Sequence, residues 1–370
     1  MTKPDRWKRG LIAVAMSALI SGVGIVNVAQ ASDEYDEVKL RYAGYLPASH
    51  ARELFIQKWM DEVTKRSGNR VTFDAYRDQA LLKTLDLLDG ASRGISDISY
   101  LAVGYFPSQL PMTTLLDLPF LTNNSQALLA SLLQIYGEFD GMKEEYDKNN
   151  LVLLTGLAGD PTILGSREPL RNIEDLKGKR IRAFGLINQA LDTLGAVPVA
   201  LPAPDIYASM ERRVIDAYSG LPASLIPPWS LHEVSDYVID YGGGLYAANA
   251  IVMNKPRFTG LNEKTQSLLL DTFSELVKDV YIADLAQLNR ERAKAIEESK
   301  MTIMRWSKEE REKATKMVRD TVWKQAIDSR EERGVPAQEF FDRFRELIAE
   351  NEPKSTDYID PVSAAIGRPD

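Results

Sequence analysis

Two arginines in one predicted strand are the residues best suited to bind an organic anion. Arg180 and Arg182 both lie in the run 179–183, and because they are two positions apart, their side chains share one face of the strand. A guanidinium can donate two parallel hydrogen bonds to a single carboxylate, which a lysine ammonium cannot do. The strand pattern alone leaves either arginine as the one that faces solvent.

Residues of the types used in covalent catalysis or zinc binding are scarce. The sequence contains two histidines, His50 and His232, and no cysteine, so a catalytic triad or a zinc cluster has few possible members. It also lacks a nucleophile elbow, a zinc-protease helix motif and a glycine-rich phosphate loop. We therefore expect no enzymatic activity, no metal and no cofactor. His50 follows the first predicted strand and could donate a hydrogen bond to a ligand, whereas the neighbours of His232 indicate a surface position.

Repeated β-α-β units must position these residues. Alternating apolar and polar runs predict the strands, and amphipathic stretches predict the helices between them. The predicted strands are 38–43, 71–76, 97–101, 151–156, 179–183 and 197–201, and the helices lie near 54–63, 81–92, 125–149 and 186–194. Strands and helices that alternate with short connections indicate mostly parallel sheets covered by helices.

The stretch 261–300 is predicted to form one very long helix. Its apolar residues recur on one face, and the other positions are largely charged. At ~1.5 Å per residue such a helix is on the order of 50 Å long, which exceeds the size of one lobe, so we expect it to span two. Charged helices are also predicted near 308–330 and 336–350, and the proline-containing tail after Glu352 is predicted to be extended or loosely ordered.

The N-terminal residues 1–31 have the pattern of a signal peptide. Four basic residues and one acidic residue precede a nearly uncharged stretch from Leu11 to Ala29, and Ala29-Gln30-Ala31 matches a small-x-small cleavage site. We place the cleavage after Ala31. The alternative is an uncleaved membrane anchor, which the cleavage site and the Ser and Gly content of the stretch disfavour. With no cysteine to accept a lipid, the mature protein is expected to be free in its compartment and not itself embedded in the membrane.

The charge of the mature chain disfavours a nucleic-acid partner. Removal of four basic residues and one acidic residue changes the formal net charge from −8 to −11. No cluster of Lys and Arg with interleaved aromatic residues offsets this negative charge. The absence of cysteine also means that no disulfide supports the fold, which must depend on its hydrophobic core.

Four short motifs follow one another in the middle of the chain. They are Asp175–Arg182 (DLKGKRIR), Leu194–Val199 (LGAVPV), Ile206–Met210 (IYASM) and Val214–Ala217 (VIDA). In order and spacing they resemble the substrate-binding proteins of tripartite ATP-independent periplasmic (TRAP) transporters of the DctP type. Each motif is weak alone, but the resemblance covers essentially the whole mature chain.

The resemblance implies an α/β fold of the periplasmic-binding-protein type II, with two α/β lobes, a ligand cleft between them and a long lobe-spanning helix. Lobe 1 would comprise 37–155 and a return segment at about 245–280. Lobe 2 would comprise 156–244 and about 281–350, followed by a C-terminal tail at 351–370. The resemblance also implies a location in the periplasm and a function without catalysis, the capture of a small organic anion and its delivery to the membrane subunits of a TRAP transporter.

By the same resemblance, Arg182 is the arginine that clamps the carboxylate of the ligand. The other pocket positions that carry over from the family are Tyr45, Ala102, Tyr105, Thr162, Ala203, Tyr218 and Gly220. Thr162 stands where some sugar-acid-binding relatives have a second arginine, and Gly220 where many relatives have an asparagine. Residues 218–220 also lack the acidic residue found in relatives that bind 2-oxo acids through a metal.

Aromatic and small residues around a single arginine predict a monocarboxylate ligand with an apolar or ring body. The tyrosines at these positions could instead only pack the lobes, and Arg77 or Arg167 could supply a second charge.

Two other functions could use the same carboxylate-binding cleft. One is a periplasmic enzyme that acts on a carboxylate, which turnover of the ligand would reveal. The other is a ligand-sensing partner of a membrane receptor, which the sequence does not distinguish from transport.

Overall fold

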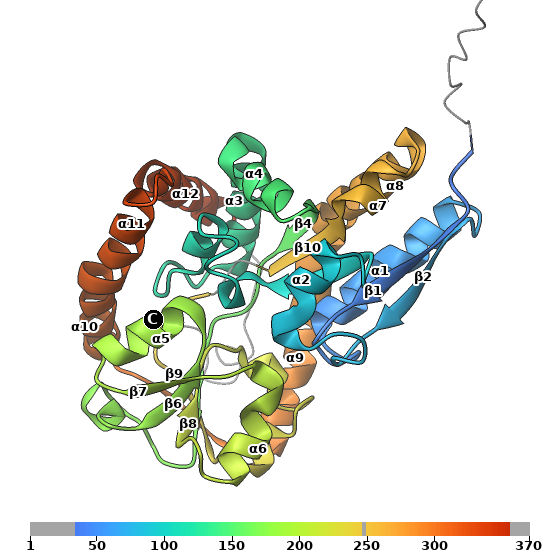
Figure 1. Ribbon diagram of the computed structural model, residues 1–370. Helices are drawn as coiled ribbons and strands as arrows, with labels where there is room; N and C mark the ends of the chain where they lie inside the picture. The colour runs from blue at the N-terminus through green and yellow to red at the C-terminus, as the bar shows by residue number, and fades with distance from the viewer. Residues whose placement is uncertain (1–33, 246–248, 356–370) are drawn as a thin grey trace, which may run out of the picture. The chain divides into compact units, whose positions relative to one another are not determined.

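Two β-sheets, each with helices packed against it, form the part of the chain that the computed structural model describes, residues 34–245 and 249–355 (Figure 1). We call each sheet with its packed helices a lobe. The sheet of lobe 1 has the order β2(Val71–Tyr76)-β1(Val38–Ala43)-β3(Ile98–Ala102)-β10(Asn249–Asn254)-β4(Leu151–Leu157). The sheet of lobe 2 has the order β11(Thr302–Arg305)-β9(Tyr237–Asp240)-β5(Leu164–Ser166)-β8(Ala217–Tyr218)-β6(Arg180–Ala183)-β7(Val197–Ala200). The predicted signal peptide and most of the predicted tail lie outside the described residues.

The two sheets are mixed, whereas the sequence pattern predicts mostly parallel ones. β10 is antiparallel to both β3 and β4, and β5 is antiparallel to both β8 and β9. These are the strands that the chain enters directly from the other lobe, from β9 into β10 and from β4 into β5. A parallel neighbour requires a crossover connection within one sheet, and these two strands have none.

Short helices cover both sheets. Lobe 1 carries α1(Ala51–Arg66), α2(Leu87–Ser92), α3(Ser125–Glu138), α4(Asp140–Lys148) and α7(Lys255–Thr259), and lobe 2 carries α5(Gly185–Thr193) and α6(Ile206–Glu211). The connections contain the 3-10 turns η1(Thr84–Asp86), η2(Val103–Tyr105), η3(Thr113–Asp117), η4(Glu174–Leu176), η5(Ala203–Asp205), η6(Ala223–Leu225) and η7(Leu231–Glu233). The single helix predicted at 125–149 is two helices, because Phe139 between α3 and α4 is extended and packs its ring edge-on against Phe340.

The predicted long helix is confirmed, with an interruption in its middle. α8(Glu263–Leu276) and α9(Ile282–Glu298) are joined by a π-helical segment, η8(Val277–Tyr281). α8 packs against α1 and β4 of lobe 1, and α9 packs against η6 of lobe 2. In the segment between β4 and β5, Asp160 accepts hydrogen bonds from Asn289 of α9 (2.9 Å) and from Ser224 of η6 (3.2 Å). The helix therefore contacts both lobes and the connection between them.

The C-terminal helices also contact both lobes. α10(Lys308–Val318), the π-helical η9(Arg319–Trp323) and α11(Lys324–Glu331) follow one another, and α12(Ala337–Asn351) ends in the turn η10(Glu352–Lys354). α10 packs against α5, whereas α12 packs against α3 of lobe 1 (Figure 1). The indole nitrogen of Trp323 donates a hydrogen bond of 2.8 Å to the Pro119 carbonyl.

A buried carboxyl group on α1 predicts a pH dependence of stability. Glu53 is completely buried and accepts hydrogen bonds from the Tyr42 hydroxyl (2.7 Å) and from Arg77 (3.1 Å). Burial raises the pKa of the Glu53 carboxyl to about 7, although its two partners act in the opposite direction. Between its unfolded pKa and pH 7 the folded state therefore retains a proton that the unfolded state releases, and stability falls as the pH rises.

We expect the parent protein to lose about 2–3 kcal/mol of unfolding free energy between pH 5 and pH 8 relative to Glu53→Gln, because a shift of one pKa unit corresponds to about 1.4 kcal/mol. Urea unfolding of both proteins at the two pH values measures this difference. The glutamine does not titrate, so the difference between the two proteins removes the contributions of the other titrating groups. If the unfolding free energies of the two proteins changed with pH in parallel, the raised pKa of Glu53 would be contradicted.

Candidate functional site

Arg182 on β6 is completely buried where the two lobes meet. Its Nε atom donates a hydrogen bond to the Leu201 carbonyl (2.9 Å), and its two terminal nitrogens donate to the Ser219 carbonyl (3.0 Å) and to the Tyr105 hydroxyl (2.6 Å). A guanidinium has five N–H donors, so one N–H on each terminal nitrogen remains beyond these three bonds. Two donors so arranged match the two oxygens of a carboxylate.

The charge of Arg182 is balanced by no carboxylate among the described residues. All three of its hydrogen-bond partners are neutral oxygen atoms, and the ring of Phe184 lies under the guanidinium at 5.4 Å. A buried charge without an opposite charge is unfavourable by several kcal/mol. The site is therefore electrostatically suited to an anion.

Arg180 has a different environment, although it lies on the same strand. Its side chain is 45% exposed and forms a two-pronged ion pair with Asp216, at 2.7 and 3.1 Å. A third bond connects it to the Arg213 carbonyl (2.9 Å). Of the two arginines that the sequence pattern leaves equivalent, Arg180 is thus the one at the surface, and its charge is already paired.

Aromatic rings from both lobes surround Arg182. The half-buried ring of Tyr105, in η2 of lobe 1, stacks on Phe184 of lobe 2 with 4.5 Å between centroids. The Tyr105 hydroxyl, which accepts from Arg182, also accepts from the Ala203 backbone N–H (3.1 Å). Tyr45 packs edge-on against Tyr105 at 6.5 Å. The structure thus brings together four of the predicted site residues, two from each lobe.

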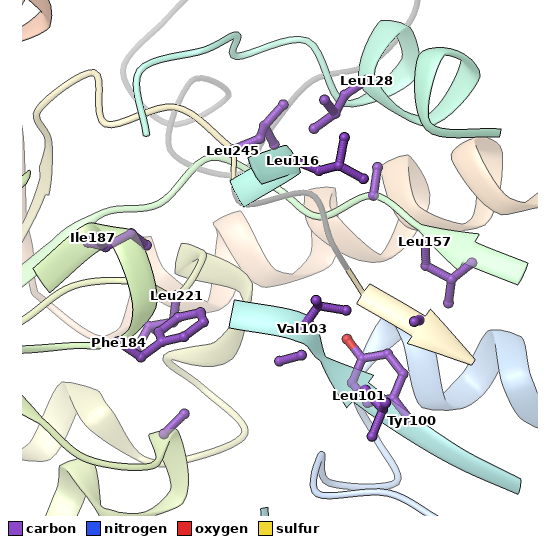
Figure 2. Close-up of a cluster of buried hydrophobic side chains, with 14 of the residues drawn as sticks. Tyr100, Leu101, Val103, Leu116, Leu128, Leu157, Phe184, Ile187, Leu221 and Leu245 are labelled. Carbon is purple, nitrogen blue, oxygen red and sulfur yellow. The ribbon is translucent and has the colours of Figure 1, made fainter. Parts of the chain in front are cut away.

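Backbone atoms of the two lobes approach closely beside these rings. A Cβ atom on Gly185 would lie 2.9 Å from the Gly104 carbonyl oxygen, and one on Gly104 would lie 2.8 Å from the Phe184 ring. Gly220 has a φ of +75°, and a Cβ there would lie 3.0 Å from the same ring. Phe184 therefore fills the space next to Gly220, where the related pattern has an asparagine. Figure 2 shows Phe184 together with the neighbouring buried side chains.

Thr162 is connected to Arg182 through two other residues, Tyr241 and Ser219. Its hydroxyl and the Ser219 hydroxyl both share a hydrogen bond with the hydroxyl of Tyr241, at 3.0 and 2.9 Å. Because the Ser219 carbonyl accepts from Arg182, this buried chain of hydroxyls supports one side of the guanidinium. Ala102 is buried at the end of β3, opposite Asn249 in the neighbouring strand.

Tyr218 has its contacts inside lobe 2. Its hydroxyl shares a hydrogen bond of 3.0 Å with Ser235, and its ring fills the space beside Gly165 on the neighbouring strand. It is completely buried. These contacts are those of a core residue.

Two residues that the sequence reasoning did not select belong to this region. Phe184 follows Arg182 by two positions at the carboxyl end of β6. Ligands bind at this end of the strands in open α/β sheets, so its position in the sequence is enough to indicate a place in the site. Arg52, in the first turn of α1, is buried and donates a hydrogen bond to the Tyr100 hydroxyl (3.2 Å). An arginine in a first helical turn gives no sign of burial. Arg77, which the sequence offers as a possible second charge for the ligand, forms an ion pair with Glu53.

Two further features concern membranes and metals. Among residues 34–245 and 249–355, no helix combines the length and apolar character needed to cross a bilayer. Within the same ranges, no three or more Asp, Glu or His side chains are arranged to hold a metal ion.

Comparison with known proteins gives one family match over most of the chain. The family model described as bacterial extracellular solute-binding protein, family 7 (DctP), matches residues 42–329. The ectoine-binding periplasmic protein TeaA of Halomonas elongata is 24% identical over 343 residues, which cover 90% of this chain and 95% of that protein.

Solved structures with the same fold include proteins with bound aromatic acids. A TRAP solute-binding protein from Rhodoferax ferrireducens, in complex with copurified benzoate, has a TM-score of 0.77 and 24% identity and covers 86% of this chain and 100% of its own. A marine metagenome TRAP solute-binding protein described as specific for aromatic acid ligands has a TM-score of 0.77 and 22% identity, with coverages of 85% and 100%.

Proposed function

Because this chain belongs to family 7 of the bacterial extracellular solute-binding proteins, the DctP family of TRAP transporter subunits, we propose that it captures a small organic acid by its carboxylate and delivers it to the membrane subunits of a TRAP transporter. One observation supports this proposal most directly. Arg182 is completely buried between the lobes, its partners are neutral, and one N–H of each terminal nitrogen is available to a carboxylate.

The proposed binding residues are Arg182, Tyr45, His50, Ala102, Tyr105, Thr162, Ala203, Tyr218 and Gly220. Arg182 binds the carboxylate, and Tyr45 and Tyr105 pack against the body of the ligand. The contacts of Tyr218 with Ser235 and Gly165 support an indirect role, in which this residue shapes the strand next to Arg182.

The proposed ligand is a monocarboxylate with an apolar or ring body. Three aromatic rings, those of Tyr45, Tyr105 and Phe184, lie together beside one arginine. Thr162 replaces the second arginine of some relatives, and Phe184 occupies the space beside Gly220. The benzoate and aromatic-acid complexes of the two structural relatives agree with such a ligand.

We also propose that the mature protein lies in the periplasm and begins after a signal peptide at 1–31. The relative from Halomonas elongata is named as a periplasmic protein, and the N-terminal sequence has the expected charge and cleavage pattern.

The proposed division of the mature chain keeps two lobes. Lobe 1 comprises 37–155 and about 245–280, and lobe 2 comprises 156–244 and about 281–350. Within the second of these segments of lobe 2, α12 packs against lobe 1.

A thermal-shift screen against organic acids tests the ligand class. Benzoate and mandelate are expected to raise the Tm more than succinate or a sialic acid at equal concentration. A ligand present at 100 times its Kd and bound only by the folded state adds about 2.7 kcal/mol of stability, which such a screen detects. Succinate or a sialic acid that binds tenfold more tightly than every monocarboxylate tested would contradict the proposal.

The same samples distinguish a binding protein from an enzyme. After long incubation with the purified protein, the ligand is expected to be recovered chemically unchanged, which chromatography measures. Conversion of the ligand would favour the periplasmic enzyme instead.

A further inference from the structure

His50 is a buried residue at the junction between β1 and α1. It is the N-cap of α1, the residue is 3% exposed, and its Nδ1 atom accepts a hydrogen bond of 3.2 Å from the Arg52 backbone N–H. An N-cap acceptor satisfies one of the backbone donors that the first helical turn leaves without a partner. This hydrogen bond accounts for one of the two nitrogens of the ring.

The second nitrogen of His50 is a hydrogen-bond donor. Burial lowers the pKa of the His50 imidazole well below its usual range, and the nearby charges of Arg52 and Arg292 lower it further, so the ring is neutral at pH 7. A neutral imidazole carries one proton. Because Nδ1 accepts a hydrogen bond, the proton is on Nε2.

The Nε2–H group of His50 has no acceptor among the described residues, although the atom is buried. A buried donor without an acceptor is unfavourable by roughly 1–3 kcal/mol, and native proteins rarely retain one without a reason. The charges of Arg52 and Arg292 make the surroundings positive. An oxygen atom with partial negative charge suits this position better than an ammonium group.

A series of contacts connects this corner of lobe 1 with Arg182. Arg52 donates to the Tyr100 hydroxyl, and the ring of Tyr100 lies 5.6 Å from the ring of Tyr45. Tyr45 contacts Tyr105, whose hydroxyl accepts from Arg182. The loop that carries Tyr45 and His50 follows the carboxyl end of β1, where ligands of open α/β sheets bind.

We infer that His50 Nε2–H is a second anchor, which binds a hydroxyl or carbonyl oxygen that the ligand carries away from its carboxylate. This inference rests on the proposed function and narrows its ligand class to ring monocarboxylates with such an oxygen. Arg182 and His50 then fix both ends of the ligand, one from each lobe.

Two substitutions separate the donor role of His50 from its role as a helix cap. His50→Asn keeps an acceptor close to the position of Nδ1, and asparagine is a favourable N-cap, but its side chain does not reach the position of Nε2. His50→Gln places an amide N–H near the position of Nε2 and weakens the cap. Calorimetry with benzoate, 3-hydroxybenzoate and 4-hydroxybenzoate gives the affinities for each variant and for the parent protein.

We expect the parent protein to bind at least one hydroxybenzoate about tenfold more tightly than benzoate, which is the effect of one hydrogen bond. His50→Asn is expected to reduce this preference to less than threefold, and His50→Gln to retain part of it. Arg182→Lys is expected to weaken the binding of all three acids and to keep the preference.

Other outcomes overturn the inference in distinguishable ways. If the parent protein binds all three acids within threefold of one another, or if His50→Asn keeps the preference, His50 is not an anchor and the proposed function stands. If the parent protein binds none of the three acids, the proposed ring-acid ligand fails together with the anchor.

Discussion

Arg182→Ala is expected to abolish measurable binding of the organic acid and to leave the fold intact. The guanidinium is completely buried and unpaired by any carboxylate of the described chain, so its loss removes the charge that balances the ligand. Truncation at a buried charge-assisted pair typically costs ~2–5 kcal/mol, much of it because the partner charge stays desolvated. At ~1.4 kcal/mol per tenfold, affinity falls roughly 30- to several-thousand-fold.

Two control variants make this test specific. Arg182→Lys keeps the charge but loses the planar pair of donors, so it is expected to recover only part of the affinity. Arg180→Ala removes an exposed side chain that is already paired with Asp216 and is expected to change the affinity little. Calorimetry with the tightest-binding acid of the thermal-shift screen measures all three. Binding by Arg182→Ala within threefold of the parent, or a larger loss in Arg180→Ala, would place the carboxylate elsewhere.

The clearest local pattern is that of β1, where the exposed Lys39 and Arg41 alternate with the buried Leu40 and Tyr42. The predicted bounds 38–43 and 71–76 coincide with β1 and β2. β10 has no alternation, since all six of its residues are buried, and β5 and β8 are only three and two residues long. Strands that are buried on both faces or very short leave no periodic signal.

The two arginines of β6 illustrate what local sequence cannot decide. Their side chains share a face by spacing, yet one is at the surface and the other is buried. The difference arises from residues distant in the sequence: Asp216 pairs with Arg180, whereas the carbonyl of Ser219 and the hydroxyl of Tyr105 bind Arg182. Within the sequence, only the family resemblance distinguishes Arg182 from Arg180.

The environments of Tyr218 and His50 also depend on residues distant in the sequence. Counting along a motif places Tyr218 in the pocket, but its ring packs beside Gly165 on a neighbouring strand that has no sequence signal of its own. The sequence around His50 indicates a loop position after the first strand and a side chain able to donate a hydrogen bond to a ligand, but it does not indicate that this side chain is buried. Burial, together with the charges of Arg52 and of Arg292 far along the chain on α9, lowers the pKa of the imidazole and keeps the ring neutral, and the cap hydrogen bond to Nδ1 then sets the tautomer.

Trp59→Ala is expected to lower the unfolding free energy by about 3–5 kcal/mol, the usual range for truncation of a buried aromatic residue. Trp59 on α1 is completely buried and stacks on Phe273 of α8, with 4.0 Å between ring centroids and 10° between ring planes. Its indole N–H donates to the Leu269 carbonyl (3.2 Å). The substitution removes these contacts between α1 and the long helix and leaves a cavity that the rigid helix pair fills only partly.

Leu54→Ala on the same helix is the matched control. Leu54 is 48% exposed, so truncation of its side chain is expected to change stability by no more than about 0.5 kcal/mol. Guanidinium unfolding at constant pH measures both variants, and an unchanged m-value shows that the transition remains comparable. A loss below about 1.5 kcal/mol in Trp59→Ala would contradict this packing, since truncation of a large core side chain to alanine costs at least about 2 kcal/mol. A similar loss in both variants would mean that the long helix depends on helix α1 as a whole and not on the Trp59–Phe273 contact.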